Sequence, residues 1–157
     1  MSYDIKIDPQ DEKVFLYIER RVAQSDLASA FGEMLPAAYS YAMAEGMTLK
    51  GPPCARYTEF APPHITVQAG LPIAVAPTSV DHDEIKVGTL PSGDAAVTVH
   101  RGAYEGLSDA HKAVEAWIAE HGHTVSGPPW EVYLTDPSEF PNPVHWQTLV
   151  CWPVQSA

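Results

Sequence analysis

Cysteines and basic residues are scarce in this chain of 157 residues. The two cysteines, Cys54 and Cys151, are far apart, so the sequence holds no cysteine-rich metal motif and predicts buried thiols rather than a disulfide. Nine lysines and arginines accompany twenty aspartates and glutamates, which leaves a formal net charge of -11. That charge repels phosphate backbones, so we expect no direct nucleic-acid partner.

Long hydrophobic runs are absent as well. No run approaches the ~20 apolar residues that span a bilayer. Residues 1–8 show no basic patch followed by an apolar stretch, the pattern of a secretion signal. We therefore expect a cytoplasmic protein with no membrane partner. With 45% hydrophobic residues, the composition is that of an ordinary globular domain, long enough to bury a core.

The chain contains one motif twice, within a single domain. Half-repeats of about residues 1–75 and 83–157 share three markers in the same order, and a polar, proline-bearing linker at residues 74–82 joins them. The matched segments are Ile5-Lys6-Ile7 with Ile85-Lys86-Val87, Arg20-Arg21 with His100-Arg101, and Gly51-Pro52-Pro53 with Gly127-Pro128-Pro129.

Each half predicts the order strand, strand, helix, strand, strand. Residues 3–7 alternate in polarity and residues 14–18 are β-branched and aromatic, so we expect these two strands to form a hairpin. In the second half, residues 95–100 should follow a turn at residues 91–94 in the same way.

Apolar residues at helical spacing predict one helix in each half. Ser25 is the expected N-cap of the first helix and Ser108 or Asp109 that of the second, while Gly46 and Gly122 should end them. The apolar stripes are Leu27, Phe31, Leu35, Ala38 and Ala42 in the first helix, and Leu107, Ala110, Val114, Trp117 and Ile118 in the second.

These elements predict an α+β fold. We expect a tandem, pseudo-two-fold repeat of strand-helix-strand-strand units, with an antiparallel sheet and two main helices. A groove where the halves meet would be a concave site for a ligand.

Glu131 is the acidic residue whose sequence neighbours most clearly suggest a function. It follows Gly127-Pro128-Pro129 in an apolar run, where strand alternation puts Glu131 and Tyr133 on one face and Trp130 on the other. Two interpretations stay open: an amphipathic strand with its polar side in water, or a carboxylate in the groove. In the groove, Glu131 would pair with a cationic ligand or activate a water as a general base. Its repeat counterpart is Ala55, so a scaffold role common to both halves does not require the acid.

Aromatic residues near strand ends and Gly-Pro-Pro turns are candidate walls of the ligand site. Each can equally belong to the core, because aromatic side chains dominate both settings, and Trp117 on the helical stripe is expected in the core. The candidates are Tyr57, which is the repeat counterpart of Tyr133, together with Phe60, Tyr104, Trp130, Trp146 and Trp152.

The histidines predict neither a metal site nor a cofactor. His121 and His123 fall at a predicted helix end with no Glu or Cys at zinc spacing, so two solvated histidines are the simpler interpretation. Ser108, Asp109 and His111 crowd one helical turn where neighbouring side chains point apart. We therefore interpret them as a cap and a solvent face rather than a catalytic triad.

Several motifs in a fixed order carry a family resemblance over almost the whole chain. They are "VHRGAYEGL", a helix ending in "EHG", then "GPPWEVYLTDP" and a terminal "WPV", with "GPPCARYTEF" as the first-half echo. The chain resembles the GyrI-like effector-binding family. That family includes the ligand-binding domains of Rob- and BmrR-type multidrug regulators and stand-alone proteins such as the gyrase inhibitor SbmC.

The resemblance implies a pair of strand-helix-strand-strand units around a central pocket, with Glu131 contacting the ligand at its floor. Ligands of such regulators are typically bulky, lipophilic and often cationic. Some stand-alone members are described as hydrolases that open the cyclopropane rings of DNA-alkylating toxins. By this resemblance, Glu131 would activate water while Tyr133 and the aromatic walls orient the substrate.

Alternative functions stay open at this stage. Both halves together use up the chain and leave no room for a helix-turn-helix, so direct control of transcription is not expected. The alternatives to hydrolysis are a non-catalytic protein that sequesters or senses drugs, and a protein-interaction module of the gyrase-inhibitor type, whose protein partner is unknown. The sequence therefore leaves enzymatic activity undecided.

Overall fold

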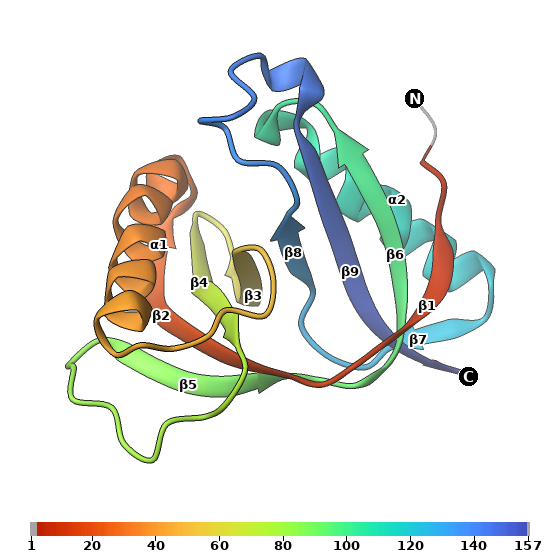
Figure 1. Cartoon of the computed structure of the whole chain (residues 1–157). Helices are drawn as coiled ribbons and strands as arrows, with labels where there is room; N and C mark the ends of the chain where they lie inside the picture. The colour runs from red at the N-terminus through yellow and green to blue at the C-terminus, as the bar shows by residue number, and fades with distance from the viewer. Residues whose placement is uncertain (1–2, 157) are drawn as a thin grey trace. The chain divides into compact units, whose positions relative to one another are not determined.

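The computed structural model describes residues 3–156 and has an α+β fold. The chain divides into two compact units. Unit 2 is Glu12–Pro91, and unit 1 comprises the residues up to Asp11 together with those from Ser92 onward. Each unit contains antiparallel strands and one main helix (Figure 1), which confirms the predicted fold class.

Unit 2 is a four-stranded antiparallel sheet with one helix. Its elements are β2 (Lys13–Ala23), the short 3-10 helix η1 (Gln24–Asp26), α1 (Leu27–Ala44), β3 (Cys54–Ala61), β4 (His64–Ile73) and β5 (Ile85–Leu90). The strand order is β3-β4-β2-β5. Helix α1 lies along β2 and β4 and buries four residues of one face: Ala30, Met34, Ala38 and Ala42.

Unit 1 has the same plan with one extra short strand. Its elements are β1 (Lys6–Gln10), β6 (Gly93–Arg101), η2 (Tyr104–Gly106), α2 (Leu107–Glu120), β7 (His123–Val125), β8 (Trp130–Tyr133), η3 (Pro143–His145) and β9 (Gln147–Ser156). The strand order is β1-β6-β9-β8, and β7 also pairs with β9. The core between α2 and the sheet comprises Ala96, Leu107, Ala110, Val114, Ile118, Val150 and Val154.

The predicted helix ends are confirmed and the predicted caps are wrong. Gly46 and Gly122 adopt φ angles of +66° and +72° just after the helices, the left-handed conformation that stops a helix. Within the described residues, no side-chain hydrogen bond caps the start of α1 or α2. Ser25, Ser108 and Asp109 therefore do not serve as caps, because a 3-10 turn leads directly into each helix.

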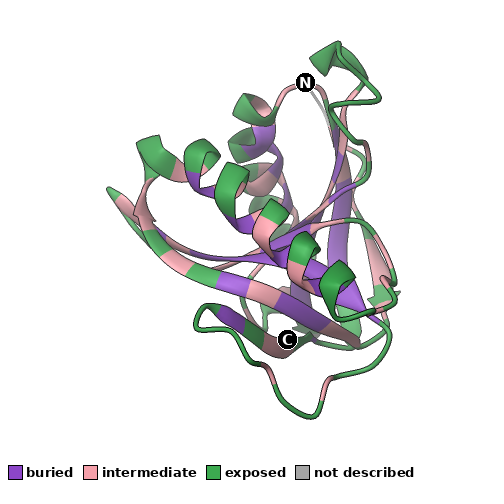
Figure 2. Ribbon diagram, turned by 60° about the vertical axis from the view of Figure 1, so that its left-hand side comes forward, coloured by how far each residue is buried: buried purple, intermediate pink, exposed green. Residues whose placement is uncertain are grey.

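The predicted apolar stripe holds for α2 and is displaced on α1. In α2 the stripe is buried except for Trp117, which is partly exposed and packs against the core. In α1, Leu27, Phe31 and Leu35 are only partly buried, because the buried line runs through Ala30 and Met34. Figure 2 shows the result, helices with a buried face and an exposed one.

The two predicted hairpins are wrong, because the first strand of each sequence half pairs within the other half's unit. Strand β1 pairs with β6, and β5 pairs with β2. The chain passes between units at residues 11–12 and at residues 91–92. The residues at both places therefore connect strands of different units instead of turning back as hairpins.

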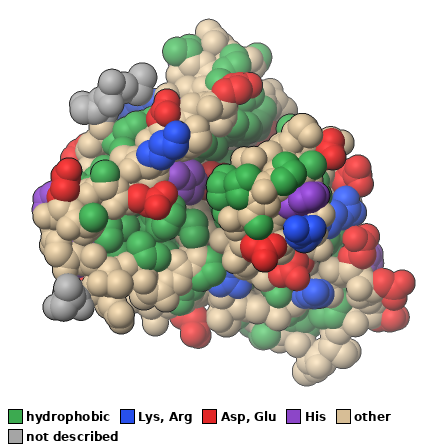
Figure 3. Space-filling view, turned by 180° about the vertical axis from the view of Figure 1, so that it is seen from behind, with side chains coloured by type: hydrophobic (Ala, Val, Ile, Leu, Met, Phe, Trp, Pro, Cys, Tyr) green, Lys and Arg blue, Asp and Glu red, His purple; other side chains and the backbone are tan. Residues whose placement is uncertain are grey.

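Other sequence-level expectations concern the linker and the surface. Residues 74–82 lie inside unit 2, so they do not connect the two compact units. In the part of the chain that the structure describes, neither helix is long and apolar enough to cross a membrane. Acidic side chains are scattered over the face drawn in Figure 3, among hydrophobic and uncharged ones.

Candidate functional site

Glu131 is buried between the sheet of unit 1 and helix α2. It is the second residue of β8 and pairs with Val150 of β9, whose side chain belongs to the core under α2. Only 3% of Glu131 is exposed. The alternation predicted for this strand places Tyr133 on the same face as Glu131 and the buried Trp130 on the opposite face. A buried carboxylate requires hydrogen-bond donors, and the structure supplies them.

Both carboxylate oxygens of Glu131 accept a hydrogen bond. The Tyr133 hydroxyl donates to Oε1 at 2.8 Å, and Nε2 of His111 lies 2.7 Å from Oε2. His111 comes from α2, the helix that covers this face of the sheet. The two contacts fix the orientation of the carboxylate from the strand side and from the helix side.

Trp152 determines which nitrogen of His111 carries the proton. The indole Nε1–H of Trp152 donates to Nδ1 of His111 at 3.0 Å. An indole N–H can only donate, so Nδ1 must be the unprotonated acceptor. The single proton of a neutral imidazole is then on Nε2, and this N–H donates to Glu131. A hydrogen-bonded chain therefore runs from Trp152 through His111 to Glu131.

Aromatic rings extend from Glu131 towards the protein surface. The Tyr104 ring centroid lies 5.7 Å from that of Tyr133 and 4.7 Å from that of Trp146. Tyr104 is 37% exposed, whereas Tyr133 is buried. Burial, followed by the negative charges of Glu131 and Asp136, raises the pKa of Tyr104. The Tyr104 ring thus lies within the electrostatic reach of the carboxylate and also meets solvent.

Three of the predicted ligand-binding residues lie outside this network. Trp130 occupies the other face of β8. Tyr57 and Phe60 belong to β3 in unit 2, where Phe60 is 65% exposed. Their part in a ligand site stays a prediction, as does the groove expected where the sequence halves meet.

His111 is the site residue that the sequence interpretation missed. We expected it on a solvent face, and this is wrong, because its ring lies between Glu131 and Trp152. The sequence did contain a signal. His111 stands four residues after Leu107 and three before Val114, both buried, so it shares the apolar stripe of α2.

The register of the two sheets shows what unit 2 carries at the position of Trp152. Leu16 is the fourth residue of β2 and pairs with Leu71 of β4. Ala96 is the fourth residue of β6 and pairs with Trp152 of β9. Leu71 is therefore the counterpart of Trp152.

The same comparison applies to the carboxylate and the imidazole. Ala55 and Glu131 are each the second residue of their strands, β3 and β8. Phe31 and His111 are each the fifth residue of their helices, α1 and α2. Unit 2 thus places apolar side chains at all three positions of the chain from Trp152 to Glu131. The fold forms without this polar network, which points to a role in function.

Of the histidines that follow α2, His121 is exposed, as expected, and His123 is partly buried, but both rings stack on Trp117. The rings of His121 and His123 are nearly parallel to Trp117, with centroids 4.1 Å and 6.0 Å from its ring. Nδ1 of His121 donates to the carbonyl oxygen of Trp117 at 2.9 Å. Among the described residues, no group of three or more His, Cys, Asp or Glu side chains could hold a metal ion.

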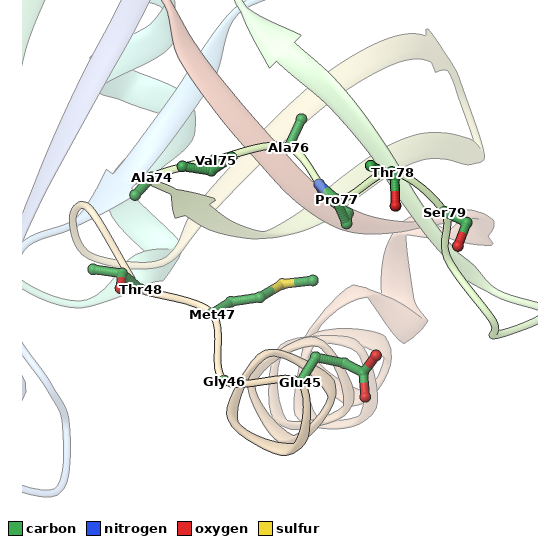
Figure 4. A pocket seen from close by; sticks show the side chains of 10 residues that line it. All are labelled: Glu45, Gly46, Met47, Thr48, Ala74, Val75, Ala76, Pro77, Thr78 and Ser79. Carbon is green, nitrogen blue, oxygen red and sulfur yellow. The ribbon is translucent and has the colours of Figure 1, made fainter.

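A hollow in unit 2 lies beside the C-terminal end of α1 (Figure 4). Residues 45–48 line one side and residues 74–79 the other. None of the predicted site residues lines this hollow. Its side chains are mostly small or apolar, with Glu45 as the charged one, so it offers little of the polar chemistry found around Glu131.

A family model matches the chain from residue 3 to residue 155, and it describes a GyrI-like small molecule binding domain. The chain belongs to this GyrI-like family. The match covers both sequence halves and includes the whole Trp152–His111–Glu131 chain. Small-molecule binding is therefore the general function of the domain.

Solved structures share the GyrI-like fold with this chain. The EcmrR C-terminal domain is 20% identical, with a TM-score of 0.81 and coverage of 100% of both chains. In an EcmrR–DNA complex, the match is also 20% identical, with a TM-score of 0.83, and covers 99% of this chain. The chain spans 58% of that EcmrR chain.

Stand-alone structures of similar length also match. SAV2435, solved with bound tetraphenylphosphonium, is 15% identical with a TM-score of 0.67, over 99% of this chain and 94% of its own. A hydrolase from Listeria innocua is 15% identical with a TM-score of 0.64, over 96% and 91%. At these identities the likeness shows the fold alone. Among curated proteins, none matches the chain.

Proposed function

We propose that this GyrI-like domain binds bulky, lipophilic or aromatic cations, with the Glu131 carboxylate as the countercharge. The observation that carries the proposal is the buried carboxylate of Glu131, oriented by Tyr133 and His111 and approached by a series of aromatic rings. We also place the protein in the cytoplasm, where the buried thiols of Cys54 and Cys151 would stay reduced.

The chemistry of the donors supports a cationic ligand. A tyrosine hydroxyl and a neutral imidazole share the negative charge of Glu131 without cancelling it. A carboxylate in a site of low dielectric attracts a cation more strongly than one in water does. The faces of Tyr104 and Trp146 add cation–π attraction and apolar contact for a ligand with aromatic groups. SAV2435, a structural neighbour, was solved with such a cation, tetraphenylphosphonium.

Binding to tetraphenylphosphonium, measured by isothermal titration calorimetry, tests this proposal. Glu131→Gln keeps the shape of the side chain and removes its charge, so we expect at least a tenfold loss of affinity, about 1.4 kcal/mol. The matched control is Glu115→Gln, because Glu115 lies on α2 with its side chain exposed. Equal affinities of the wild type and Glu131→Gln would exclude Glu131 from the site.

Hydrolysis of cyclopropane-bearing alkylating toxins is our second candidate function. The two donors hold the Glu131 carboxylate in place, and a carboxylate in hydrogen-bond reach of a water can accept its proton. Thr148 lies opposite Tyr133 in the strand register, and its buried hydroxyl has no hydrogen-bond partner among the described residues. This hydroxyl is available to hold a water or a polar group of the substrate. Glu131 would then act as general base, with Tyr133 orienting it.

Mass spectrometry separates the two candidates. The protein is incubated with a panel of cyclopropane-bearing alkylators, with wild type, Glu131→Gln and Glu115→Gln side by side. The hydrolase is supported if the wild type and the Glu115→Gln control form a water-added product over many turnovers and Glu131→Gln does not. Retention of the intact compound without product supports binding alone.

The acidic surface supports our prediction that the domain makes no direct contact with nucleic acid. The formal charge of -11 opposes the phosphate backbone. An electrophoretic mobility assay with random-sequence duplex DNA at low salt checks this, and a shifted band would overturn it.

A further inference from the structure

We propose that Trp152 keeps His111 neutral, and that this neutral imidazole maintains the cation selectivity of the Glu131 site in mildly acidic solution. His111 is a positioning residue in this scheme, since it acts through the carboxylate. The inference rests on the proposed function, because it concerns the charge that a cationic ligand would meet at Glu131.

Both ring nitrogens of His111 take part in hydrogen bonds, so neither can accept a second proton in this geometry. Nε2–H donates to Glu131, and Nδ1 accepts from the indole of Trp152. A proton can bind Nδ1 only if the Trp152 N–H moves away, because an indole N–H cannot accept. The Trp152 ring packs against the core under α2 and meets the His111 ring edge-on, with centroids 5.8 Å apart. Protonation of His111 therefore requires a packed ring to shift.

The charge of His111 matters because of its distance from Glu131. An imidazolium would place a full positive charge 2.7 Å from the carboxylate oxygen. It would then occupy the role of the cationic ligand and oppose its binding. A neutral imidazole donates the same hydrogen bond and leaves the negative charge for the ligand. The indole of Trp152 thus keeps the negative charge of Glu131 available to the ligand, whereas a protonated His111 would neutralise it.

Other ionisable groups surround this pair. Glu131 and Tyr133 face His111 from β8, and β9 contributes Trp152 and uncharged neighbours. On β6, His100 has both ring nitrogens within hydrogen-bond distance of partners, the Tyr3 hydroxyl and the Ala103 carbonyl. The further charged groups of α2 are exposed: Asp109, Lys112, Glu115 and Glu120. His111 is the histidine of this group that contacts the carboxylate.

The comparison with unit 2 supports a specific role for this chain of hydrogen bonds. Its counterparts there are Phe31, Ala55 and Leu71, so the fold itself does not call for an indole, an imidazole and a carboxylate together. The three polar positions occur together in one unit and are apolar together in the other. Such a pattern is expected if Trp152, His111 and Glu131 function together.

The test measures tetraphenylphosphonium affinity at pH 7.5 and pH 5.5. We expect the wild type to change little between the two. Trp152→Phe keeps an aromatic ring and removes the N–H, so Nδ1 of His111 becomes free to take a proton. At pH 5.5 a proton on this nitrogen would make an imidazolium beside Glu131, so the apparent affinity of this variant should fall about tenfold relative to pH 7.5.

Two controls make the result specific. Trp117→Phe changes the tryptophan of α2, which packs against the same core as Trp152 and does not belong to the network, and should behave as the wild type at both pH values. Adding His111→Gln to Trp152→Phe replaces the imidazole by an amide that still donates an N–H and cannot ionise. This double variant should lose the pH dependence of Trp152→Phe.

The outcomes of the proposed function and of this inference are distinguishable. Failure of the wild type to bind at either pH overturns the proposed function. Binding by the wild type that itself falls tenfold at pH 5.5, or a pH-independent Trp152→Phe, overturns the inference alone. If Trp152→Phe does not fold, the ¹⁵N chemical shifts of His111 in the wild type decide. A neutral ring protonated on Nε2 at pH 5.5 supports the inference, and an imidazolium there overturns it.

Discussion

Ala55 and Glu131 occupy the same register position in the two sheets, yet one is an apolar core residue and the other a buried carboxylate. Unit 2 therefore serves as an internal reference for unit 1. It shows which parts of the site the fold requires and which it tolerates.

Transplanting the residues of unit 2 into unit 1 should preserve the fold. The triple variant His111→Phe, Glu131→Ala, Trp152→Leu replaces the polar network by the apolar groups of unit 2 and leaves none of the three groups without its partner, which should offset part of the cost of the side-chain volume that is lost. His111→Ala alone leaves one carboxylate oxygen without its donor and should destabilise by about 1–3 kcal/mol. Urea denaturation compares the two. A triple variant less stable than His111→Ala would contradict this view.

Tyr133→Phe isolates the hydroxyl from the ring. The change removes the hydrogen bond to Glu131 and keeps the packing against Tyr104. Because hydrogen bonds to charged groups contribute about 1.5–3 kcal/mol, we expect a loss of that size in the free energy of unfolding. Tyr39→Phe is the control, since Tyr39 is exposed on α1. Equal losses in both variants would show that the hydroxyl does not hold the carboxylate.

Gly106→Ala should destabilise unit 1 through a steric clash with His100. A Cβ at this position would lie 2.7 Å from Cε1 of His100. The backbone is not the obstacle, because φ of Gly106 is -84°. The His100 ring is buried and both of its nitrogens contact partners, so it cannot move aside freely. Overpacking of this kind costs about 1–3 kcal/mol.

The control for this change is Gly32→Ala in α1, where a Cβ meets nothing within 4 Å. Alanine there should stabilise the helix by up to about 1 kcal/mol. Thermal and chemical denaturation of both variants give the comparison. If Gly106→Ala is as stable as the wild type, the His100 ring is more mobile than its contacts indicate.

Alkaline pH should destabilise the protein through Cys54. Burial raises the pKa of its thiol to about 12, whereas an unfolded thiol titrates near 8.5. The folded state thus binds the proton more tightly, so this contribution is complete below about pH 8.5 and is lost as the pH rises towards 12. The expected slope is up to about 1.4 kcal/mol for each pH unit between those values.

Urea denaturation at pH 8 and pH 10.5 checks this prediction. Tyr104 also has a raised pKa and contributes in the same direction. The relevant quantity is therefore the difference between wild type and Cys54→Ala, whose stability should depend less on pH. Identical pH dependence in the two proteins would refute the assignment to Cys54.

Much of the fold follows from local patterns in the sequence. Strand and helix order, the helix ends at Gly46 and Gly122, and the orientation of Glu131 depend on spacing along the chain, which a sequence displays directly. The pairing of β1 with β6 does not. It depends on contacts between distant segments, and neighbouring strands ordinarily suggest a hairpin.

For the candidate site, the sequence singled out Glu131, Tyr133 and Trp152 and missed His111. Glu131 stood out because a charged residue interrupts an apolar strand. His111 did not, because a histidine four residues after Leu107 fits a helix surface as well as a helix core. Only the tertiary contacts with Trp152 and Glu131 reveal its tautomer and its role.

The pairing of β1 with β6 and of β5 with β2 also affects how the protein folds during synthesis. Strand β1 leaves the ribosome early, but its partner β6 follows only after all of unit 2 has emerged. Domains tend to fold as units during synthesis, so β1 waits with both edges unpaired while unit 2 completes its sheet. Its residues include Lys6, Asp8 and Pro9, and charge and proline hinder pairing with a wrong neighbour. The charged residues and the proline of β1 thus reduce the risk of aggregation while this strand is unpaired.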